Sequence, residues 1–517
     1  MTGSGTAASA NVANGIAMSS NGTLALADGT GLASNYSLNS TVINIAQRVL
    51  NSSGSKTYDA NTDALAGAIT LSNLVSGEAL NHSGTATIGS ANAGSYTITN
   101  LSGISIADGS GGAASNYTLT GGTHNFTVNQ RPLNATLARQ YDGTTTAAGS
   151  TLSSFDALQG GETLTMTGSG TAASANVANG IAMSSNGTLA LADGTGLASN
   201  YSLNSTVINI AQRVLNSSGS KTYDANTDAL AGAITLSNLV SGEALNHSGT
   251  ATISSANAGS YTITNLSGIS IADGSGGTAS NYTLTGGTHN FTVNRRAVSV
   301  SGTRLYDATT NAVASDLSTH ANLVGSETLN LSGTGTIASK NVGSNKTVSV
   351  GTLALADGSN GGLAANYTLS GGTHQLTVNQ RPLNATIQRV YDGSLNAEGS
   401  NLSSFDALQG GETLFLSGTG TVSNKNVSSN QSITLGTLAL SDTGATGDTA
   451  NYSLNSAKLN IVQRPISTVY LTKLYDASTT VQASDLQTMT NLVGSETLTL
   501  TGTSTISDAN VGVKTVN

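Results

Sequence analysis

A tyrosine followed directly by an aspartate, with a lysine or arginine two residues earlier, is the group of side chains in this sequence most suggestive of an active site. It occurs six times, at Tyr58-Asp59, Tyr141-Asp142, Tyr223-Asp224, Tyr306-Asp307, Tyr391-Asp392 and Tyr475-Asp476. Catalysis rarely needs six copies of one site. The repetition therefore favours a structural role, in which the tyrosine packs at the edge of a core and the aspartate accepts backbone N–H groups in the following turn.

The basic residue and nearby Asn, Asp and Glu side chains also raise the possibility of an intramolecular Lys–Asn isopeptide bond. Such a bond would need a lysine in every copy, but the basic residue is arginine at Arg139, Arg304 and Arg389. Arginine cannot form the bond. The sequence therefore disfavours this chemistry.

Calcium is the third candidate. The triplets Asp59, Asn61, Asp63 and Asp224, Asn226, Asp228 resemble the first half of a calcium-binding loop, but the glycine and the distal glutamate do not follow at the required offsets. The other four copies lack the acidic third position. The six histidines have no paired, metal-ligating spacing. The sequence predicts a turn here, with calcium as a weak alternative and no other cofactor.

The tyrosines of the motif lie 82 to 85 residues apart, which makes the chain a tandem array. A Gln-Arg pair, or Asn294-Arg295 in one copy, marks the end of each unit. Cutting after it predicts partial repeats at 1–48 and 465–517 and complete repeats at 49–131, 132–213, 214–295, 296–381 and 382–464. No flexible linker separates them. Because the chain starts and stops within a repeat, we expect it to be part of a longer protein.

Inside each unit, apolar and polar residues alternate, as at Leu133, Ala135 and Leu137, with Gly, Asn and Asp at intervals typical of turns. This pattern predicts antiparallel strands, with short helix candidates only at 153–159 and 403–409. The expected fold is an all-β tandem array of small domains of about 83 residues forming an elongated rod. A β-solenoid is the alternative, although no repeat of 20 to 30 residues, its usual rung, is found.

Composition excludes several classes of function. Charged residues make up 9% of the 517 residues, the net charge is −9, and Lys and Arg form no run. A nucleic-acid or anionic-membrane partner is therefore not expected. The chain has no cysteine, which suits export in an unfolded state, and no stretch of 18 apolar residues that would span a membrane.

Further short motifs, which we call landmarks, recur in a fixed order after the Tyr-Asp motif. They are Gly-Glu or Ser-Glu just before a predicted strand, Asn-Val or Asn-Ala, Leu-Ala-Asp-Gly, Asn-Tyr-x-Leu and Gln-Arg. Together they resemble the YDG repeats of large filamentous-haemagglutinin-like exoproteins of Gram-negative bacteria. The signature glycine is present at Gly143 and Gly393 and is alanine in the other four copies. The resemblance implies secretion, commonly through an outer-membrane partner, and roles in adhesion, aggregation or biofilm matrix.

We therefore expect a non-enzymatic stalk or fibre segment of a secreted bacterial surface adhesin, located outside the cell. Its partners would be other copies of itself, neighbouring cells or matrix, and an outer-membrane secretion protein. A self-assembling extracellular filament is one alternative. A repeated glycan-binding module is another, and it requires the recurrent tyrosines to be exposed.

Overall fold

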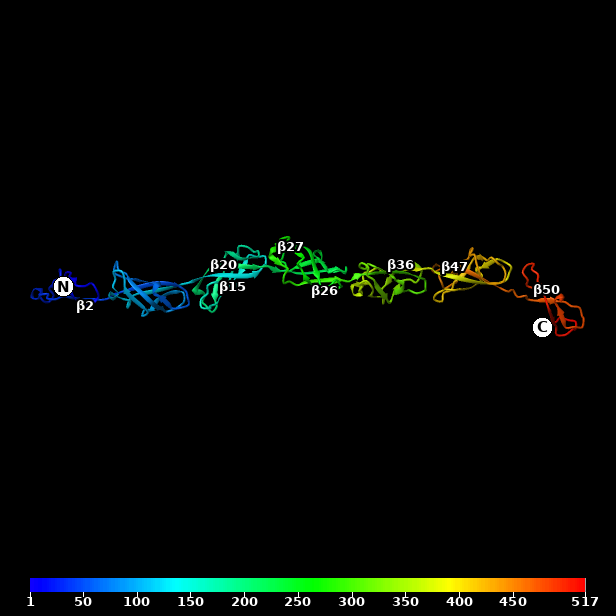
Figure 1. Cartoon of the computed structure of the whole chain (residues 1–517), viewed down its shortest axis with the longest axis horizontal. Coiled ribbons are helices and arrows are strands. Elements are labelled where there is room, and N and C mark those ends of the chain that lie inside the picture. Colours follow the sequence, from blue (N-terminus) through cyan, green and yellow to red (C-terminus); the bar gives the residue numbers. More distant parts are fainter. Residues whose placement is uncertain (517) are drawn as a thin grey trace. The chain divides into compact units, whose positions relative to one another are not determined.

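The computed structural model describes residues 1–516 and consists there of β-strands and short 3-10 helices, without an α-helix (Figure 1). The predicted all-β fold is confirmed. The two helix candidates were wrong: each region contains a strand, β15 (Leu152–Phe155) or β42 (Leu402–Phe405), followed by an irregular turn. These segments pair with the first strands of their repeats, which outweighs their weak helical pattern.

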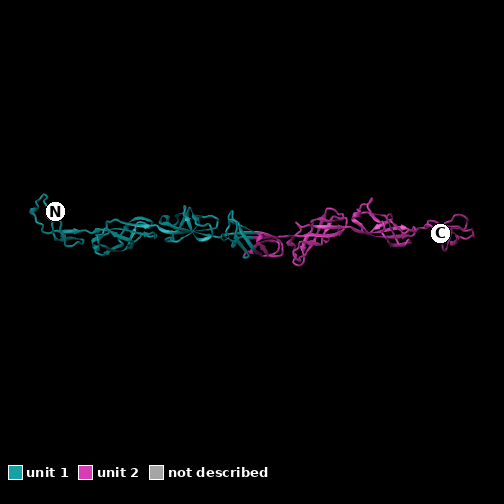
Figure 2. Ribbon diagram, turned by 90° about the horizontal axis from the view of Figure 1, so that it is seen from above, with its two compact units in different colours: residues 1–218, 235–249, 267–289 teal, residues 219–234, 250–266, 290–517 magenta. Residues whose placement is uncertain are grey.

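The chain divides into two compact units, which are described separately (Figure 2). The first comprises residues 1–218, 235–249 and 267–289, and the second comprises residues 219–234, 250–266 and 290–517. The division falls within the 214–295 repeat. No helix in residues 1–516 has the length and apolar character needed to cross a bilayer.

The repeat at 132–213 shows the architecture most completely. Its elements are β13 (Arg131–Gln140), β14 (Thr146–Ala148), η4 (Gly149–Thr151), β15, β16 (Leu164–Thr167), β17 (Ser169–Ala172), β18 (Ala178–Ser185), β19 (Ala190–Asp193), η5 (Ala198–Asn200) and β20 (Tyr201–Ala211). One sheet has the order β14-β17-β18-β20-β13-β15, and β16 and β19 form a separate ribbon. Sheets are thus built within a repeat rather than from stacked coils, so the β-solenoid alternative is wrong.

The first and last strands of the repeat run parallel, which the expectation of antiparallel strands did not include. β13 and β20 pair from Arg131 and Tyr201 to Gln140 and Ala211, with one bulge, whereas the other neighbours are antiparallel. A parallel pair needs a long crossover connection, and the strands between β13 and β20 provide it. Parallel pairs also join β5 (Asn51–Thr57) to β12 (His124–Asn129), β31 (Ser299–Leu305) to β39 (Gln375–Asn379), and β40 (Arg381–Val390) to β47 (Tyr452–Val462).

The junction arginine begins a repeat instead of ending one. Arg131 pairs with Tyr201 of the following repeat, and only Gln130 separates it from β12. Its counterpart farther along is Arg296, which pairs with Tyr367, so the sequence-based assignment to Arg295 was shifted by one residue. At both junctions the last strand of one repeat is therefore connected to the first strand of the next by a single residue.

The cores of neighbouring repeats are continuous. One cluster combines Tyr58, Ile88 and Phe126 of one repeat with Leu133 and Tyr201 of the next. The alternation in β13 points Leu133, Ala135 and Leu137 inward, each at most 1% exposed. Because each repeat has only a thin core, burial between repeats supplies part of its apolar contact.

Residues 1–48 have the same sequence as residues 166–213 but different structure. The last strand, β20, spans Tyr201–Ala211, whereas its counterpart, β3, spans only Val42–Ile45. Tyr36 is 71% exposed, while the equivalent Tyr201 is 2% exposed. The difference follows from pairing, because residues 1–48 contain no counterpart of β13.

Candidate functional site at the joints between repeats

The basic residue of the Tyr-Asp motif closes the turn that follows it. Lys56 Nζ forms an ion pair with Asp59 Oδ1 at 2.8 Å and donates to the carbonyl oxygens of Asn61 and Asp63, each at 2.8 Å, and to Asn61 Oδ1. Arg304 likewise contacts Asp307 and the carbonyl of Thr309. The lysine and arginine copies thus supply the same internal cation.

This geometry places an ammonium group among the proposed calcium ligands. In the second such copy, Lys221 Nζ contacts Asp224 Oδ1 at 2.8 Å and the carbonyl of Asn226 at 2.8 Å, and Asn226 Oδ1 accepts the backbone N–H of Asp228. A calcium ion would have to displace the lysine. An isopeptide bond would likewise require this lysine to leave the oxygens to which it donates.

We expect a calcium chelator to leave the melting temperature of the chain unchanged, because the lysine already supplies positive charge to these oxygens. Differential scanning calorimetry with EDTA and with added calcium checks this. Lys56→Met, which frees the oxygens, is the comparison and is the form in which a calcium-dependent shift could develop. A drop in melting temperature on chelation of the unmodified chain would contradict the expectation.

The aspartate of the motif is a turn residue. Asp142 Oδ1 accepts the backbone N–H of Thr144 at 2.9 Å. The residue between them is left-handed, with φ of 77° at Gly143 and between 58° and 65° at the four alanines. A Cβ on Gly143 would lie 2.8 Å from Val240 Cγ1 of the next repeat, so this glycine serves packing between repeats as well as the turn.

The tyrosine of the motif reaches into the following repeat. Tyr58 donates its hydroxyl to Glu162 Oε1 at 2.5 Å, and Tyr201 donates to Glu162 Oε2 at 2.5 Å. The two rings meet edge to face with centroids 5.3 Å apart. Both carboxylate oxygens are therefore bonded by buried phenols, one from each repeat. We call this arrangement the Tyr–Glu–Tyr clasp.

The clasp recurs with the same geometry. The other complete sets are Tyr141–Glu243–Tyr282, Tyr223–Glu327–Tyr367 and Tyr306–Glu412–Tyr452. Their O–O distances run from 2.5 to 2.8 Å and their ring centroids lie 5.2 to 5.4 Å apart. In every set the first tyrosine belongs to the preceding repeat.

A buried asparagine forms a second contact across the joint. Asn200 Oδ1 accepts the backbone N–H of Ala93 at 2.8 Å, and its Nδ2 donates to Asn92 Oδ1 at 3.0 Å. Asn281, Asn366 and Asn451 hold the Asn-Val or Asn-Ala turn of their preceding repeats in the same way. These four side chains are at most 1% exposed, so an unpaired amide here would be costly.

The remaining landmarks position these side chains. Asp193 Oδ1 accepts the backbone N–H of Ala198 at 2.7 Å, which braces η5, the turn that presents Asn200 and Tyr201. At the next junction, Arg213 donates to the carbonyls of Asn238 and Tyr141, and Gln212 donates to that of Ser280. The ordered landmarks of the sequence thus meet at the joints.

Sequence reasoning singled out the six Tyr-Asp pairs and noted the glutamates and the second tyrosines only as recurring landmarks, not as site residues. Tyr58, Tyr141, Tyr223 and Tyr306 lie in complete clasps. Tyr391 donates to Glu496, to which no other tyrosine of the described residues donates. Tyr475 is 66% exposed in the partial last repeat. The equal recurrence of the glutamates and the second tyrosines marks them as important in every unit, but nothing in the sequence shows that they pair across repeats.

One joint carries an additional cation. Lys340 Nζ lies 2.7 Å from Glu412 Oε1 and 5.9 Å from the centroid of the Tyr306 ring. The hydrogen bond with Glu412 raises the pKa of the Lys340 ammonium. Although burial opposes it, the bonds from Lys340 and the two tyrosines lower the pKa of Glu412 overall. The glutamate of this joint therefore keeps its charge to a lower pH than an ordinary glutamate does.

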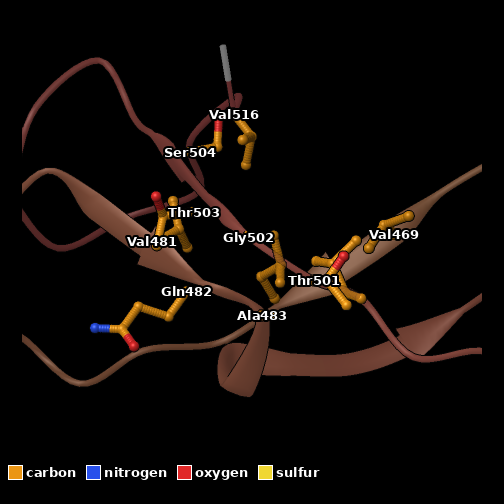
Figure 3. Close-up of a pocket in the computed structure, with 11 residues that line it drawn as sticks. Val469, Val481, Gln482, Ala483, Thr501, Gly502, Thr503, Ser504 and Val516 are labelled. Atoms are coloured by element: carbon orange, nitrogen blue, oxygen red, sulfur yellow. The ribbon is translucent and has the colours of Figure 1, made fainter.

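An apolar groove lies in the partial repeat at 465–516 (Figure 3). Val469, Val481, Leu500 and Val516 are among its lining residues. Val469 corresponds to Val300 of a complete repeat, which is fully buried in β31, the strand that pairs with β39 from Ser301 onward. Because residues 465–516 form no counterpart of β39, the groove is part of an open core and not a built ligand site.

Burial, followed by the bond to glutamate, raises the pKa of Tyr58, Tyr141 and Tyr223 to about 12 from the ordinary value of 10.0. A raised folded-state pKa stabilises the fold fully below pH 10, and the contribution is lost as the pH rises through 12. We expect the joints to fail cooperatively in that window. The circular dichroism of the folded chain should be lost in that window, and an unchanged circular dichroism signal through it would contradict this.

The chain was compared with known protein families and with curated proteins. The YDG domain matches residues 46–124, 128–208, 211–290, 290–376, 373–460 and 462–517. No curated protein matches the chain. The six matched segments cover most of the sequence, and each includes a Tyr-Asp motif whose environment is described above. The chain therefore belongs to the YDG domain family, as a tandem array of its repeats.

Proposed function

We propose that this chain is a structural spacer, a stalk or fibre segment of a secreted bacterial surface adhesin that serves adhesion, aggregation or biofilm matrix. The observation that carries the proposal is the Tyr–Glu–Tyr clasp, which recurs at four successive joints with nearly unchanged geometry. An array in which the recurring feature is a contact between successive repeats, and not a ligand pocket, is suited to holding two attached parts at a distance.

The use of the recurrent side chains supports this function over a binding module. Tyr58, Tyr141, Tyr223 and Tyr306 are at most 5% exposed, and their hydroxyls are bonded to glutamate. A repeated glycan site would need such tyrosines on the surface. At the complete joints the phenols and carboxylates are bonded to one another, so the proposal assigns no reaction to them.

The location outside the cell rests on the family resemblance and on composition. The absence of cysteine and the 9% content of charged residues suit a long chain exported unfolded through an outer-membrane partner. The chain would then fold repeat by repeat, because each sheet is local to one repeat and each joint needs only its neighbour.

Deleting residues 131–295 from the protein in its native host tests the function. The deletion joins Gln130 to Arg296. Because residues 49–129 and 214–294 differ at only two positions, the new joint has nearly the same sequence as the existing joint at Arg296. We expect surface display, measured with an antibody to residues 382–464, to be unchanged, while adhesion or aggregation of cells falls. Full adhesion with the shortened array, or retention of the protein inside cells, would overturn the proposal.

A further inference from the structure

The first and last strands of a repeat are arranged to resist tension along the chain. In the 132–213 repeat, the chain enters at Arg131 on β13 and leaves at Ala211 on β20. These strands are parallel and paired over ten residues of β13. Entry and exit therefore lie at opposite ends of one paired segment, about 30 Å long at the rise of a parallel strand.

Tension through these two points pulls the strands past each other. The hydrogen bonds of a parallel pair are spaced evenly along it, so a sliding force loads all of them at once. Peeling two strands from one end would instead break the bonds one at a time. We refer to the two loading directions as shear and peel. The native entry and exit of this repeat give shear.

The packing of the two strands adds to this resistance. β13 and β20 are interior strands, because β15 covers the other edge of β13 and β18 covers the other edge of β20. Leu133, Leu137 and Ile208 are fully buried beneath them. Sliding would drag these side chains out of their positions in the core before any strand is released.

The length of the pair differs between repeats. β40 and β47 of the 382–464 repeat also pair over ten residues of β40. In the 49–131 repeat, β5 pairs with β12 over six residues, and a separate two-residue pair joins β4 (Arg48–Val49) to β11 (Tyr117–Thr118). In the 296–381 repeat the corresponding pairs span five and two residues.

Tension passes directly from one repeat to the next. β20 ends at Ala211 and β21 (Arg213–Val214) begins two residues later, so no linker absorbs extension. The clasp holds the same junction from the side through Tyr141, Glu243 and Tyr282. A flexible connection would permit rotation before the strands were loaded, but this junction has one connecting residue.

We propose that the parallel strand pair of each complete repeat is a mechanical clamp and that the array bears force with a built-in order of failure. The 49–131 and 296–381 repeats yield first, and the 132–213 and 382–464 repeats yield last. This rests on the proposed function, since a spacer between two attachments is what would experience tension. The force measurement below does not depend on where the protein is located.

Single-molecule force spectroscopy on the full chain, attached by its N-terminus and by a single cysteine, tests the clamp. The native sequence has no cysteine, so the attachment is unique. In Ala211→Cys, tension shears both the 49–131 and the 132–213 repeat. We expect two unfolding events, with the shorter clamp of 49–131 yielding at lower force. Forced unfolding reports the unfolding rate, so equilibrium stability does not set this order.

Ser202→Cys is the matched variant. It attaches the chain near Tyr201, at the same end of the pair as Arg131, and so peels β20 from β13 while 49–131 remains in shear. We expect the 132–213 repeat to yield at a severalfold lower force and before 49–131, which reverses the order. Equal forces for the two attachments would overturn the clamp even if the spacer function held. The clamp would also be overturned if deletion of residues 131–295 reduced adhesion while the Ala211→Cys and Ser202→Cys attachments gave equal unfolding forces.

Discussion

Replacing Glu243 with alanine is expected to lower the free energy of unfolding of the chain by about 2–6 kcal/mol. The change removes the acceptor of two buried phenols, Tyr141 and Tyr282, whose hydroxyls lie 2.6 and 2.7 Å from its two oxygens. Each buried donor left without a partner costs about 1–3 kcal/mol. The total is comparable to the stability of a small domain, so the neighbouring repeats should melt separately.

Glu78 provides the matched control, because residues 1–129 and 166–294 differ at only two positions, Gly89 and Ala113. Glu78 and Glu243 therefore share the same local sequence. Glu78 accepts the hydroxyl of Tyr117, and no second tyrosine of residues 1–516 donates to it. We expect Glu78→Ala to cost about half as much as Glu243→Ala in urea titrations followed by circular dichroism.

Comparing Glu243→Ala with Glu78→Ala distinguishes a glutamate that connects two repeats from one that stabilises only its own repeat. If both substitutions had the same effect, the glutamate would act only within its own repeat, and the clasp would contribute nothing between repeats. Glu243→Gln adds a second check, because an amide oxygen can still accept one hydroxyl while its NH2 group faces the other. An intermediate loss is expected, and full stability of this variant would show that the negative charge is not needed.

The strands and the repeat length could be predicted from the sequence because their signals are local. Leu133, Ala135 and Leu137 alternate with polar residues, and each lies in β13 with its side chain buried. The Tyr-Asp motif marks the period. Its aspartate lies in a turn, as turn chemistry predicts, because Asp142 and Thr144 are only two residues apart.

The joints could not be predicted because their partners are far apart in sequence. Tyr58 and Glu162 are separated by 104 residues, more than the length of a repeat. Recurrence shows that both residues matter in every unit, but it does not distinguish a contact within a repeat from one between repeats. The parallel pairing of β13 with β20 is likewise non-local, and alternation alone cannot give strand direction.

The duplicated segments show this limit within one molecule. The sequence of residues 36–46 is identical to that of residues 201–211, yet only the second copy forms the long strand β20. Local propensity is the same in both, so β13 must account for the difference by supplying hydrogen-bond partners and an apolar surface. The strand is a property of the complete repeat.

Tyr201→Ala is expected to lower the free energy of unfolding by about 3–5 kcal/mol, the range for deleting a buried aromatic ring. The change removes the edge-to-face contact with Tyr58 and the bond to Glu162 Oε2, and it leaves the backbone N–H of Gln159 without its acceptor, the Tyr201 hydroxyl. It acts on both repeats at once. Circular dichroism during urea unfolding should therefore show the 49–131 and 132–213 repeats unfolding in separate transitions, where the unmodified chain unfolds them together.

Tyr36→Ala is the control for Tyr201→Ala. Its local sequence is the same as that of Tyr201, but the side chain is 71% exposed. We expect a change within about 0.5 kcal/mol, as for other surface substitutions. A large effect at Tyr36 would mean that the tyrosine stabilises its own turn. A large effect at Tyr201 alone would mean that the recurrent tyrosine stabilises the array through partners outside its own turn, namely Tyr58 of the preceding repeat and Glu162 and Gln159 of its own repeat.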